Sequence, residues 1–248
     1  MEPFDPWEDE ELMDRVFGKY LSQQSRTGRF WSNIRVRQKR VLWRIVIGST
    51  HALKRLLDIV ISLIAILLLS PILAVTWLAI QIEDPGSAIF RQIRVGRWGR
   101  TFTMYKFRSM VMNADVLKEK LLAQNESSAG VIFKMKDDPR ITRTGRWIRK
   151  FSVDELPQLF NVLLGDMSLV GPRPPLPGEV EDYTLSDRRR LDVMPGITGL
   201  WQVSGRSNID FQGQVRLDIE YIRTQGFWSD LIILAKTVPA VLLGRGAY

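Results

Sequence analysis

The most extended feature of the hydrophobic pattern is an uninterrupted apolar run from Ile59 to Ile82. It contains no charged residue, and its polar side chains are those of Ser62, Ser70, Thr76 and Gln81. A helix rises about 1.5 Å per residue, so about 24 residues reach about 36 Å, more than the apolar core of a bilayer at about 30 Å. Core helices of soluble proteins are rarely so long and so apolar. The run predicts a membrane-embedded segment over 59–82.

Ser70 and Pro71 lie at the midpoint of this segment. Pro71 lacks a backbone N–H, and its ring crowds the carbonyl of Leu67. In lipid that carbonyl needs another donor, which a serine hydroxyl can supply. Each half, 59–70 and 72–82, would be about 16–18 Å long and would fit one leaflet. The pattern therefore predicts a re-entrant helix-break-helix, and a kinked spanning helix is the alternative.

Basic residues flank the segment on both sides: Arg40, Arg44, Lys54 and Arg55 before it, and Arg91, Arg94, Arg97, Arg100, Lys106 and Arg108 after it. Under the positive-inside rule this favours a hairpin with both ends cytoplasmic, held against anionic headgroups. Lys54, Arg55 and Asp58 are expected to anchor the segment. An unpaired Asp58 would be costly at this boundary, so an Arg55–Asp58 pair, at i and i+3, is predicted.

The residues before the apolar run divide into two parts. Over 39–58, bases alternate with aliphatic residues, which predicts an amphipathic helix at the membrane interface; a core helix is the alternative. Residues 1–38 start too acidic for a signal peptide and are expected to form a weakly ordered charged arm.

The remainder, 83–248, has the pattern of an irregular, helix-rich α/β domain on the cytosolic side. Strands are predicted over 88–94 and 101–107, around a turn at 96–99. Helices are predicted over 113–124, 156–164, 187–193 and 212–224. The apolar tail 227–243 is interrupted by Pro239, and we expect it to associate with the membrane.

Composition narrows the chemistry. The chain has 248 residues with 35 Lys and Arg against 27 Asp and Glu, a net charge of +8, and it has no Cys and one His. Disulfides, zinc–thiolate sites, Cys nucleophiles and two-His metal sites are excluded. A nucleophile would have to come from Asp, Glu, Lys, Ser, Thr or Tyr. The positive charge indicates nucleic acid, an anionic membrane surface or phosphorylated substrates as partners.

Asp154 and Glu155 are adjacent carboxylates at a predicted helix start. Three bases precede them: Arg146, Arg149 and Lys150. Positive surroundings would keep Asp154 ionised with a lowered pKa, and an ionised Asp can attack phosphorus to form an acyl phosphate. Glu155 could hold Mg²⁺, which takes one or two carboxylates plus substrate phosphates. Ser152 and Glu155 also match a capping box, so a purely structural role stays open.

Two later segments are candidates for phosphate binding. In Gly171-Pro172-Arg173-Pro174 the prolines fix the backbone on both sides of Arg173, whose planar guanidinium suits bidentate contact with phosphate. A stiff connector with a solvated arginine is the alternative. In the glycine-rich segment 195–206, Trp201 and Arg206 could meet a base or a phosphate, although an ordinary loop is the simpler interpretation.

Taken together, the motifs resemble a known family. They are Lys54-Arg55-x-x-Asp58, the broken apolar segment with Ser70-Pro71, Tyr105-Lys106-Phe107-Arg108-Ser109-Met110, Asp154-Glu155-Leu156-Pro157-Gln158, Gly171-Pro172-Arg173-Pro174 and the segment 195–206. Six motifs in this order resemble the bacterial sugar transferases, the monotopic polyprenyl-phosphate phosphoglycosyl transferases. The resemblance covers roughly 50–248 and is to the minimal catalytic form.

The resemblance implies a mechanism. Asp154 would attack the β-phosphorus of a UDP-sugar, release UMP and form a sugar-phosphoryl-aspartate. The phosphate of undecaprenyl phosphate would then take up the sugar phosphate, which initiates glycoconjugate assembly. Glu155 would bind Mg²⁺ and Arg173, between Pro172 and Pro174, would bind phosphate. Arg149 and Asp218 match active-site positions of the family.

The resemblance also implies a place in the cell, the bacterial inner membrane, with the catalytic domain on the cytoplasmic face. Expected partners are membrane lipids, the UDP-sugar and undecaprenyl phosphate, with no nucleic acid; the sequence leaves a homodimer and the identity of the sugar open. The alternative function is a membrane-tethered basic module that binds nucleic acid or anionic lipid. It accounts for the charge and the anchor but not for the Asp154-Glu155 pair or the segment around Arg173.

Overall fold

The computed structural model describes residues 26–114, 116–117, 138–205 and 209–242, and the chain divides into two compact units, Met1–Leu53 and Lys54–Tyr248. In the first unit, residues 26–53 are helical. The predicted charged arm, 1–38, therefore includes helix from residue 26 onward, in a stretch rich in helix formers such as Arg, Gln and Lys. The start of the arm, and the side chains of 39–51 on which the amphipathic prediction rests, lie outside the described part.

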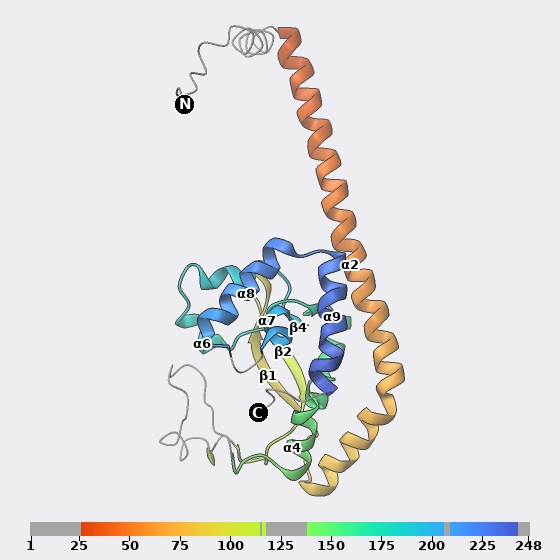
Figure 1. Cartoon of the computed structure of the whole chain (residues 1–248), viewed down its shortest axis with the longest axis vertical. Helices are drawn as coiled ribbons and strands as arrows, with labels where there is room; N and C mark the ends of the chain where they lie inside the picture. Colours follow the sequence, from red (N-terminus) through yellow and green to blue (C-terminus); the bar gives the residue numbers. More distant parts are fainter. Residues whose placement is uncertain (1–25, 115, 118–137, 206–208, 243–248) are drawn as a thin grey trace, which may run out of the picture. The chain divides into compact units, whose positions relative to one another are not determined.

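Helix α2 spans Arg26–Glu83, 58 residues, and passes through Pro71 without interruption. The predicted helix break at Ser70-Pro71 is therefore wrong: the helix bends within Lys54–Glu83 but remains continuous (Figure 1). The hydroxyl of Ser70 donates to the carbonyl oxygen of Leu67 at 2.8 Å. This carbonyl is the one that Pro71, lacking an N–H, leaves without its helical donor. The predicted role of the Ser70 hydroxyl is confirmed, and it explains how the helix tolerates the proline.

One helical stretch in the described residues, Ala52–Glu83, is long and apolar enough to cross a membrane. Its large side chains are mostly exposed: Leu56, Val60, Ile61, Leu63, Ile64, Leu67, Leu68, Ile72, Val75, Trp77, Leu78 and Ile82. An apolar surface of this extent is unfavourable in water and suits a lipid environment. The prediction of a membrane-embedded segment is supported at this coarse level.

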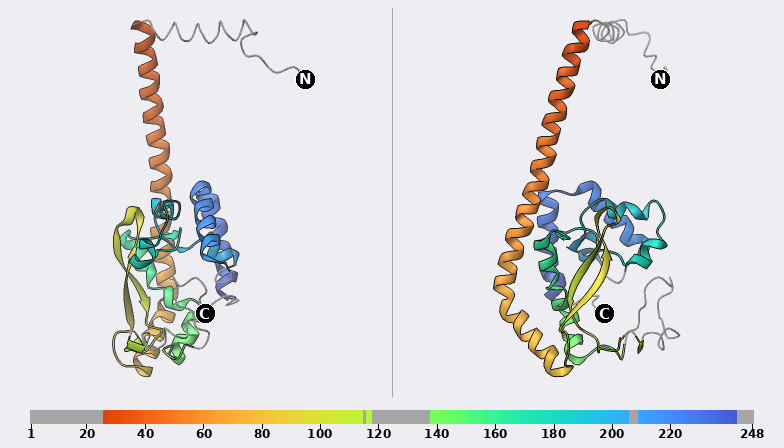
Figure 2. Two further views of the ribbon diagram at one scale, coloured as in Figure 1. Left: turned by 90° about the vertical axis from the view of Figure 1, so that its left-hand side faces the viewer. Right: turned by 180° about the vertical axis from the view of Figure 1, so that it is seen from behind.

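The two predicted strands form an antiparallel hairpin, β1 (Ile89–Val95) and β2 (Thr101–Phe107), with Ile89 opposite Phe107 and Val95 opposite Thr101. A short 3₁₀ turn, η1 (Arg97–Gly99), closes it, and the prediction of two strands around this turn is confirmed. Figure 2 (left) shows the hairpin and the two C-terminal helices on opposite sides of the body.

Most of the other elements are short. They are α4 (Arg143–Lys150), η3 (Val153–Glu155), α5 (Gln158–Leu164), β3 (Ser168–Val170), α6 (Pro177–Glu181), η4 (Asp187–Asp192), β4 (Gly196–Thr198), α7 (Leu200–Ser204), α8 (Phe211–Thr224) and α9 (Phe227–Leu242). The helices predicted over 156–164 and 212–224 are confirmed, and 187–193 is helical in the 3₁₀ form. Of 113–124, residue 113 lies in a turn, residues 114, 116 and 117 are helical, and the rest is not described. Helix α9 continues through Pro239, contrary to prediction, because a proline one turn before a helix end removes only one hydrogen bond.

The principal core lies where β2, α5, β3, α8 and α9 meet. Its buried members are Met104, Leu159, Val162, Met167, Leu169, Val170, Tyr221 and Ile233. A smaller cluster joins the end of α2 to the hairpin and α4: Ile80, Ala88, Phe107 and Ile148. The hairpin is thus packed on both clusters, which makes its inner face a rigid base for the candidate site.

Candidate functional site

The two candidate catalytic carboxylates lie in η3, between α4 and α5. Ser152 precedes them in the left-handed conformation, at φ 54°, and makes no side-chain cap. The capping box considered from the sequence therefore does not form, and the Glu155 carboxylate is available for another contact. A non-glycine residue in this conformation costs about 1–2 kcal/mol, so the surrounding structure holds this turn against strain.

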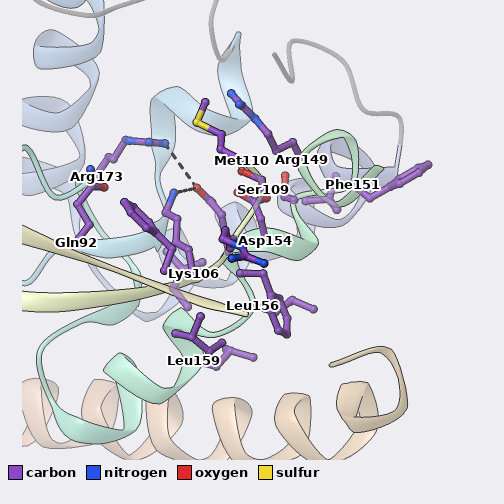
Figure 3. A pocket seen from close by; sticks show the side chains of 18 of the residues that line it. Gln92, Lys106, Ser109, Met110, Arg149, Phe151, Asp154, Leu156, Leu159 and Arg173 are labelled. Carbon is purple, nitrogen blue, oxygen red and sulfur yellow. Dashed lines mark hydrogen bonds and ion pairs between the residues drawn. The ribbon is translucent and has the colours of Figure 1, made fainter. Parts of the chain in front are cut away.

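Glu155 is bound by two bases from distant parts of the chain. Its Oε1 atom lies 2.7 Å from Lys106 Nζ on β2 and 3.8 Å from Arg173 Nη1 (Figure 3). Burial disfavours the ionised form, but the charges of Lys106 and Arg173 outweigh it and lower the pKa of Glu155 to about 2. Glu155 is thus a permanent anion near neutral pH.

Asp154 behaves in the opposite way. Burial and then the negative charge of Glu155 raise the pKa of Asp154 to about 6, against the opposing effects of Lys106, Arg149 and Arg173. The lowered pKa expected from the sequence is wrong, because the sequence shows the neighbouring bases but not the burial. Two adjacent carboxylates with separated pKa values are a common sign of divided roles in a site. Asp154 is still mostly ionised at neutral pH, and it is the more basic and more nucleophilic of the two.

Arg173 is presented by a segment that is fastened to β4. Strands β3 and β4 are parallel, and beyond them the Gly171 N–H donates to Thr198 O and the Gly196 N–H to Pro172 O, each at 2.9 Å. A Cβ atom on Gly171 would lie 2.4 Å from Met194 O, so only glycine fits this close approach. Pro172 and Pro174 are buried and shape the backbone, while the Arg173 side chain faces the cavity.

A cavity of about 1030 Å³ opens beside these groups. Four residues predicted for catalysis or phosphate binding line it together, Asp154, Glu155, Arg173 and Arg149, and Lys106 joins them. Its wall also includes Trp201 and the C-terminal part of α9. The volume is at the upper end of the range for small-molecule sites, about 300–1000 Å³.

Asp218 and Arg206 do not join this group in the described structure. Asp218, on α8, is 1% exposed and pairs with Arg190 at 2.7 Å; it does not line the cavity. Burial raises the pKa of Asp218 to about 6, and Arg190 opposes this shift. The placement of Asp218 as a substrate-binding residue is therefore not supported. Arg206 lies outside the described residues.

The three predicted anchoring residues hold the N-terminal end of Lys54–Glu83 against the body. Lys54 Nζ lies 2.5 Å from Asp230 Oδ2 on α9. Arg55 donates to the carbonyls of Val162 and Leu163 at the end of α5, and the Leu169 N–H donates to Asp58 Oδ1 at 3.1 Å. The predicted Arg55–Asp58 pair is wrong, because each of the two residues has a partner in the body.

The C-terminal end of the same helix is held in a similar way. Both carboxylate oxygens of Glu83 accept backbone N–H groups at the start of α4, from Arg143 at 2.7 Å and from Thr144 at 2.8 Å. Arg108, on the far side of the hairpin, donates to the carbonyl of Asp84. One domain therefore contacts both ends of the apolar stretch.

A divalent cation can be tested against the donors present. In the described part of the chain, no three His, Cys, Asp or Glu side chains gather into a protein-only metal cage. Mg²⁺ in phosphate chemistry uses one or two carboxylates together with substrate phosphates and water. Asp154 and Glu155, facing a cavity with room for a diphosphate, fit this donor set.

Two contributors were missed as functional residues when the sequence was considered alone. In the sequence, Lys106 stands out only as part of a motif, and Arg94 only as a base after the apolar segment. Lys106 shares one face of β2 with Phe102 and Met104, so its direction toward the body was available from the alternating pattern. Arg94 lies between Ile93 and Val95, and the pattern gave no such signal for it. Their partners, Glu155 for Lys106 and Pro174 for Arg94, lie far along the chain and were not available.

Comparison with known proteins agrees with this arrangement. A family model described as bacterial sugar transferase matches residues 49–244. Galactosyl transferase CpsE of Streptococcus agalactiae is 54% identical over 196 residues, which are 78% of this chain and 43% of that protein. Undecaprenyl-phosphate galactose phosphotransferase of Salmonella typhimurium is 48% identical over 203 residues, 81% of this chain and 42% of that protein. The chain thus spans about two fifths of the length of these two relatives.

A relative of more similar length is the exopolysaccharide production protein ExoY of Sinorhizobium fredii, 39% identical over 198 residues, which are 79% of this chain and 88% of that protein. The match of the family model to most of the sequence confirms the resemblance seen in the motifs. The chain belongs to the bacterial sugar transferase family.

Proposed function

We propose that the protein transfers a sugar 1-phosphate from a UDP-sugar to undecaprenyl phosphate, through a covalent intermediate on Asp154. The observation that carries this proposal is the pairing of a nucleophile-competent Asp154 with an ionised Glu155, which Lys106 and Arg173 bind at the wall of a large cavity that Asp154 also lines. Relatives named for undecaprenyl-phosphate galactose and glucose transfer support the reaction class.

In the first step a carboxylate oxygen of Asp154 forms a bond to the β-phosphorus of the donor. The bond from that phosphorus to the bridging oxygen breaks, and its electron pair leaves with UMP. In the second step a phosphate oxygen of the acceptor lipid bonds to the same phosphorus, and the Asp154 carboxylate departs. A carboxylate with a pKa of about 6 is ionised when it attacks and is stable when it leaves, so no proton has to be moved at this atom.

The cations around the pair would stabilise the charge on the transferring phosphoryl group. Lys106 contacts Glu155 from β2, and Arg173 contacts it from the segment between β3 and α6. Arg149 lines the same cavity. Fixed positive groups around a phosphoryl group lower its barrier mainly through position and charge. Glu155, held by these two bases, keeps them near Asp154 before the donor arrives.

Mg²⁺ would be held by Glu155 together with the diphosphate of the donor. Bound there, it would neutralise part of the charge on the leaving UMP. Removing divalent cations with a chelator should abolish turnover, and titrating Mg²⁺ back should restore it. Turnover that persists in the chelator would remove the metal from the proposal.

We also propose that α2 enters the cytoplasmic leaflet of the inner membrane and returns to the same side. Ala52–Glu83 comprises 32 residues, about 48 Å of helix, which is longer than a crossing requires. Lys54, Arg55 and Asp58 at one end and Glu83 at the other contact the same domain. A helix that crossed the bilayer would separate these two ends, so the contacts support the re-entrant topology.

The topology has its own test. The chain has no cysteine, so single cysteines at Ala52 and at Ser87 can be labelled in sealed inner-membrane vesicles with an impermeant reagent. Both should react from the cytoplasmic side. Reaction of the two positions from opposite sides would overturn the re-entrant arrangement and leave the proposed chemistry in place.

The activity is tested by UMP release from purified protein with Mg²⁺ and polyprenyl phosphate, across a panel of UDP-sugars. UDP-galactose and UDP-glucose come first, because relatives are named for those sugars. The relative named for exopolysaccharide production suggests the start of polysaccharide assembly as the pathway step. Absence of UMP release with every donor would contradict the proposed function.

A further inference from the structure

Arg94 is a buried arginine at the inner end of the candidate site. It lies on β1, is 7% exposed and lines the same cavity as Asp154. All three of its guanidinium nitrogens are bound by protein acceptors. Nε and Nη2 donate to Gln92 Oε1 at 3.0 and 2.7 Å, and Nη1 donates to the carbonyl of Pro174 at 2.9 Å.

The hydrogen bond from Arg94 to Pro174 joins β1 to the segment that carries Arg173, and a second hydrogen bond lies next to it. The next residue of the strand, Val95, donates its N–H to Pro175 O at 2.9 Å. On the other side of Arg173, Pro172 O accepts the Gly196 N–H from β4. Arg173 therefore lies in a short backbone bridge, residues 172–175. This bridge is hydrogen-bonded to β4 at Pro172 and to β1 at Pro174 and Pro175.

Prolines surround Arg173 in this bridge. A proline cannot donate a backbone hydrogen bond, so Pro172, Pro174 and Pro175 offer only their carbonyls to neighbours. The side chain of Arg173 is itself partly exposed, at 39%, and its Nη1 atom lies 3.8 Å from Glu155 Oε1. Gln92, which binds Arg94, lines the same cavity as Arg173 (Figure 3).

Arg94 also carries a charge that is costly at this place. Burial lowers the pKa of Arg94 to about 10, and the nearby charge of Arg173 acts in the same direction. A neutral side chain would fill the same space without this cost. A buried cation next to another cation lowers the stability of the fold. The presence of Arg94 here indicates that its guanidinium, which can bind Gln92 and Pro174 together, has a role other than stabilising the fold.

We propose that Arg94 is a positioning residue, which sets the direction of Arg173 toward the donor diphosphate by holding the carbonyl of Pro174. The inference rests on the proposed function, since the donor is the ligand that Arg173 would meet. It assigns Arg94 no direct contact with the substrate, because its guanidinium is already bound on all three nitrogens.

A double-mutant cycle separates this role from a general effect on folding. UMP release would be measured for the wild type, Arg94→Met, Arg173→Ala and the double variant, each per folded enzyme, with the UDP-sugar that the wild type uses. Arg94→Met should lower kcat/KM for the donor about 10- to 100-fold, since misplacing a positioning group by about 1 Å can cost that much. In the Arg173→Ala background the same change should cost less than about 2-fold, because the group it positions is gone.

Two further variants serve as a matched control and as a conservative substitution. Arg100→Met removes an exposed arginine from the turn of the same hairpin and should leave kcat/KM unchanged. Arg94→Lys keeps the charge but has one nitrogen in place of the planar fork, so it cannot reproduce the three hydrogen bonds to Gln92 and Pro174. It should therefore show most of the loss, and it serves if Arg94→Met does not fold.

Equal losses from the Arg94 change with and without Arg173 would overturn the inference while leaving the proposed reaction intact. Full activity of Arg94→Lys would also overturn it. If the wild type released no UMP from any donor, both the proposed function and this inference would fail.

Discussion

Two buried acid–base clusters lie in the same domain and differ in their surroundings. In the first, Glu155 is bound by Lys106 and Arg173 beside a large cavity. In the second, Asp218 is paired with Arg190 at 2.7 Å, with side-chain exposures of 1% and 5%, and neither residue lines that cavity. Both clusters shift carboxylate pKa values, since Asp218 and Asp154 each rise to about 6.

The comparison shows that a perturbed carboxylate is not by itself a sign of catalysis. In the second cluster the raised pKa of Asp218 arises from burial in a sealed interior, where the pair joins α8 to η4. In the first, burial is combined with an excess of cations and an opening large enough for a substrate. Variants in the first cluster should therefore change activity, and variants in the second should change stability.

The largest expected effect is that of Asp154→Asn. Without a nucleophilic oxygen anion, the rate of UMP release should fall on the order of 10⁴-fold or more. The melting temperature should be unchanged or higher, because the raised pKa means that the ionised Asp154 is held at a cost in the folded protein. The rate is measured by UMP release and the stability by thermal unfolding in detergent. Undiminished turnover would remove Asp154 as the nucleophile.

Asp218→Ala should produce the reverse pattern. It leaves Arg190 buried without its carboxylate partner, which typically costs about 3–5 kcal/mol of stability. The KM for the donor should not change in the protein that remains folded. Glu220→Ala, at an exposed position on the same helix, is the matched control and should have little effect on either quantity. A raised KM with intact stability would instead support the substrate-binding role that the family resemblance implied.

The pH dependence of turnover should depend on Lys106. Asp154 acts as an anion, so the rate should rise with pH through its pKa of about 6 and fall as pH drops below it. Lys106 is the leading cation that lowers the pKa of Asp154, so Lys106→Met should move the rising limb to higher pH as well as lower the plateau. Lys236→Met, at an exposed position on α9, is the control. An unshifted limb would mean that Asp154 does not control the profile.

The smallest expected effect concerns the membrane helix. Ser70→Ala removes the donor to the Leu67 carbonyl and should lower stability in nanodiscs by about 0.5–1.5 kcal/mol. In a Pro71→Ala background the helix regains its own N–H donor, and the serine substitution should then cost much less. Equal costs in both backgrounds would show that the hydroxyl does not compensate for the proline.

Local features of the fold could be predicted because they depend on neighbours in sequence. The hairpin follows from alternation over 88–94 and 101–107, and the helix ending at Gly165 follows from its apolar spacing and from a glycine at φ 96°. The bond from Ser70 to Leu67 followed from the geometry of proline. The continuity of α2 did not, because a helix tolerates proline when another donor replaces the lost hydrogen bond.

The parts that could not be predicted depend on distant contacts. Strands β3 and β4 are only three residues long and pair in parallel, without a pattern that identifies them in the sequence. Lys106 and Glu155 meet from different elements, and the raised pKa of Asp154 depends on burial. Asp58 was assigned to Arg55 because the two are near in sequence, whereas its partner is the backbone of Leu169.

The most direct test of the central claim is mass spectrometry of the protein incubated with its UDP-sugar and Mg²⁺ in the absence of acceptor lipid. We expect one sugar phosphate added to the peptide that contains Asp154, with release of one equivalent of UMP. The adduct should disappear when undecaprenyl phosphate is supplied, and Asp154→Asn should not form it. Turnover in the complete reaction with no adduct at Asp154, or an adduct that persists in Asp154→Asn, would contradict the account.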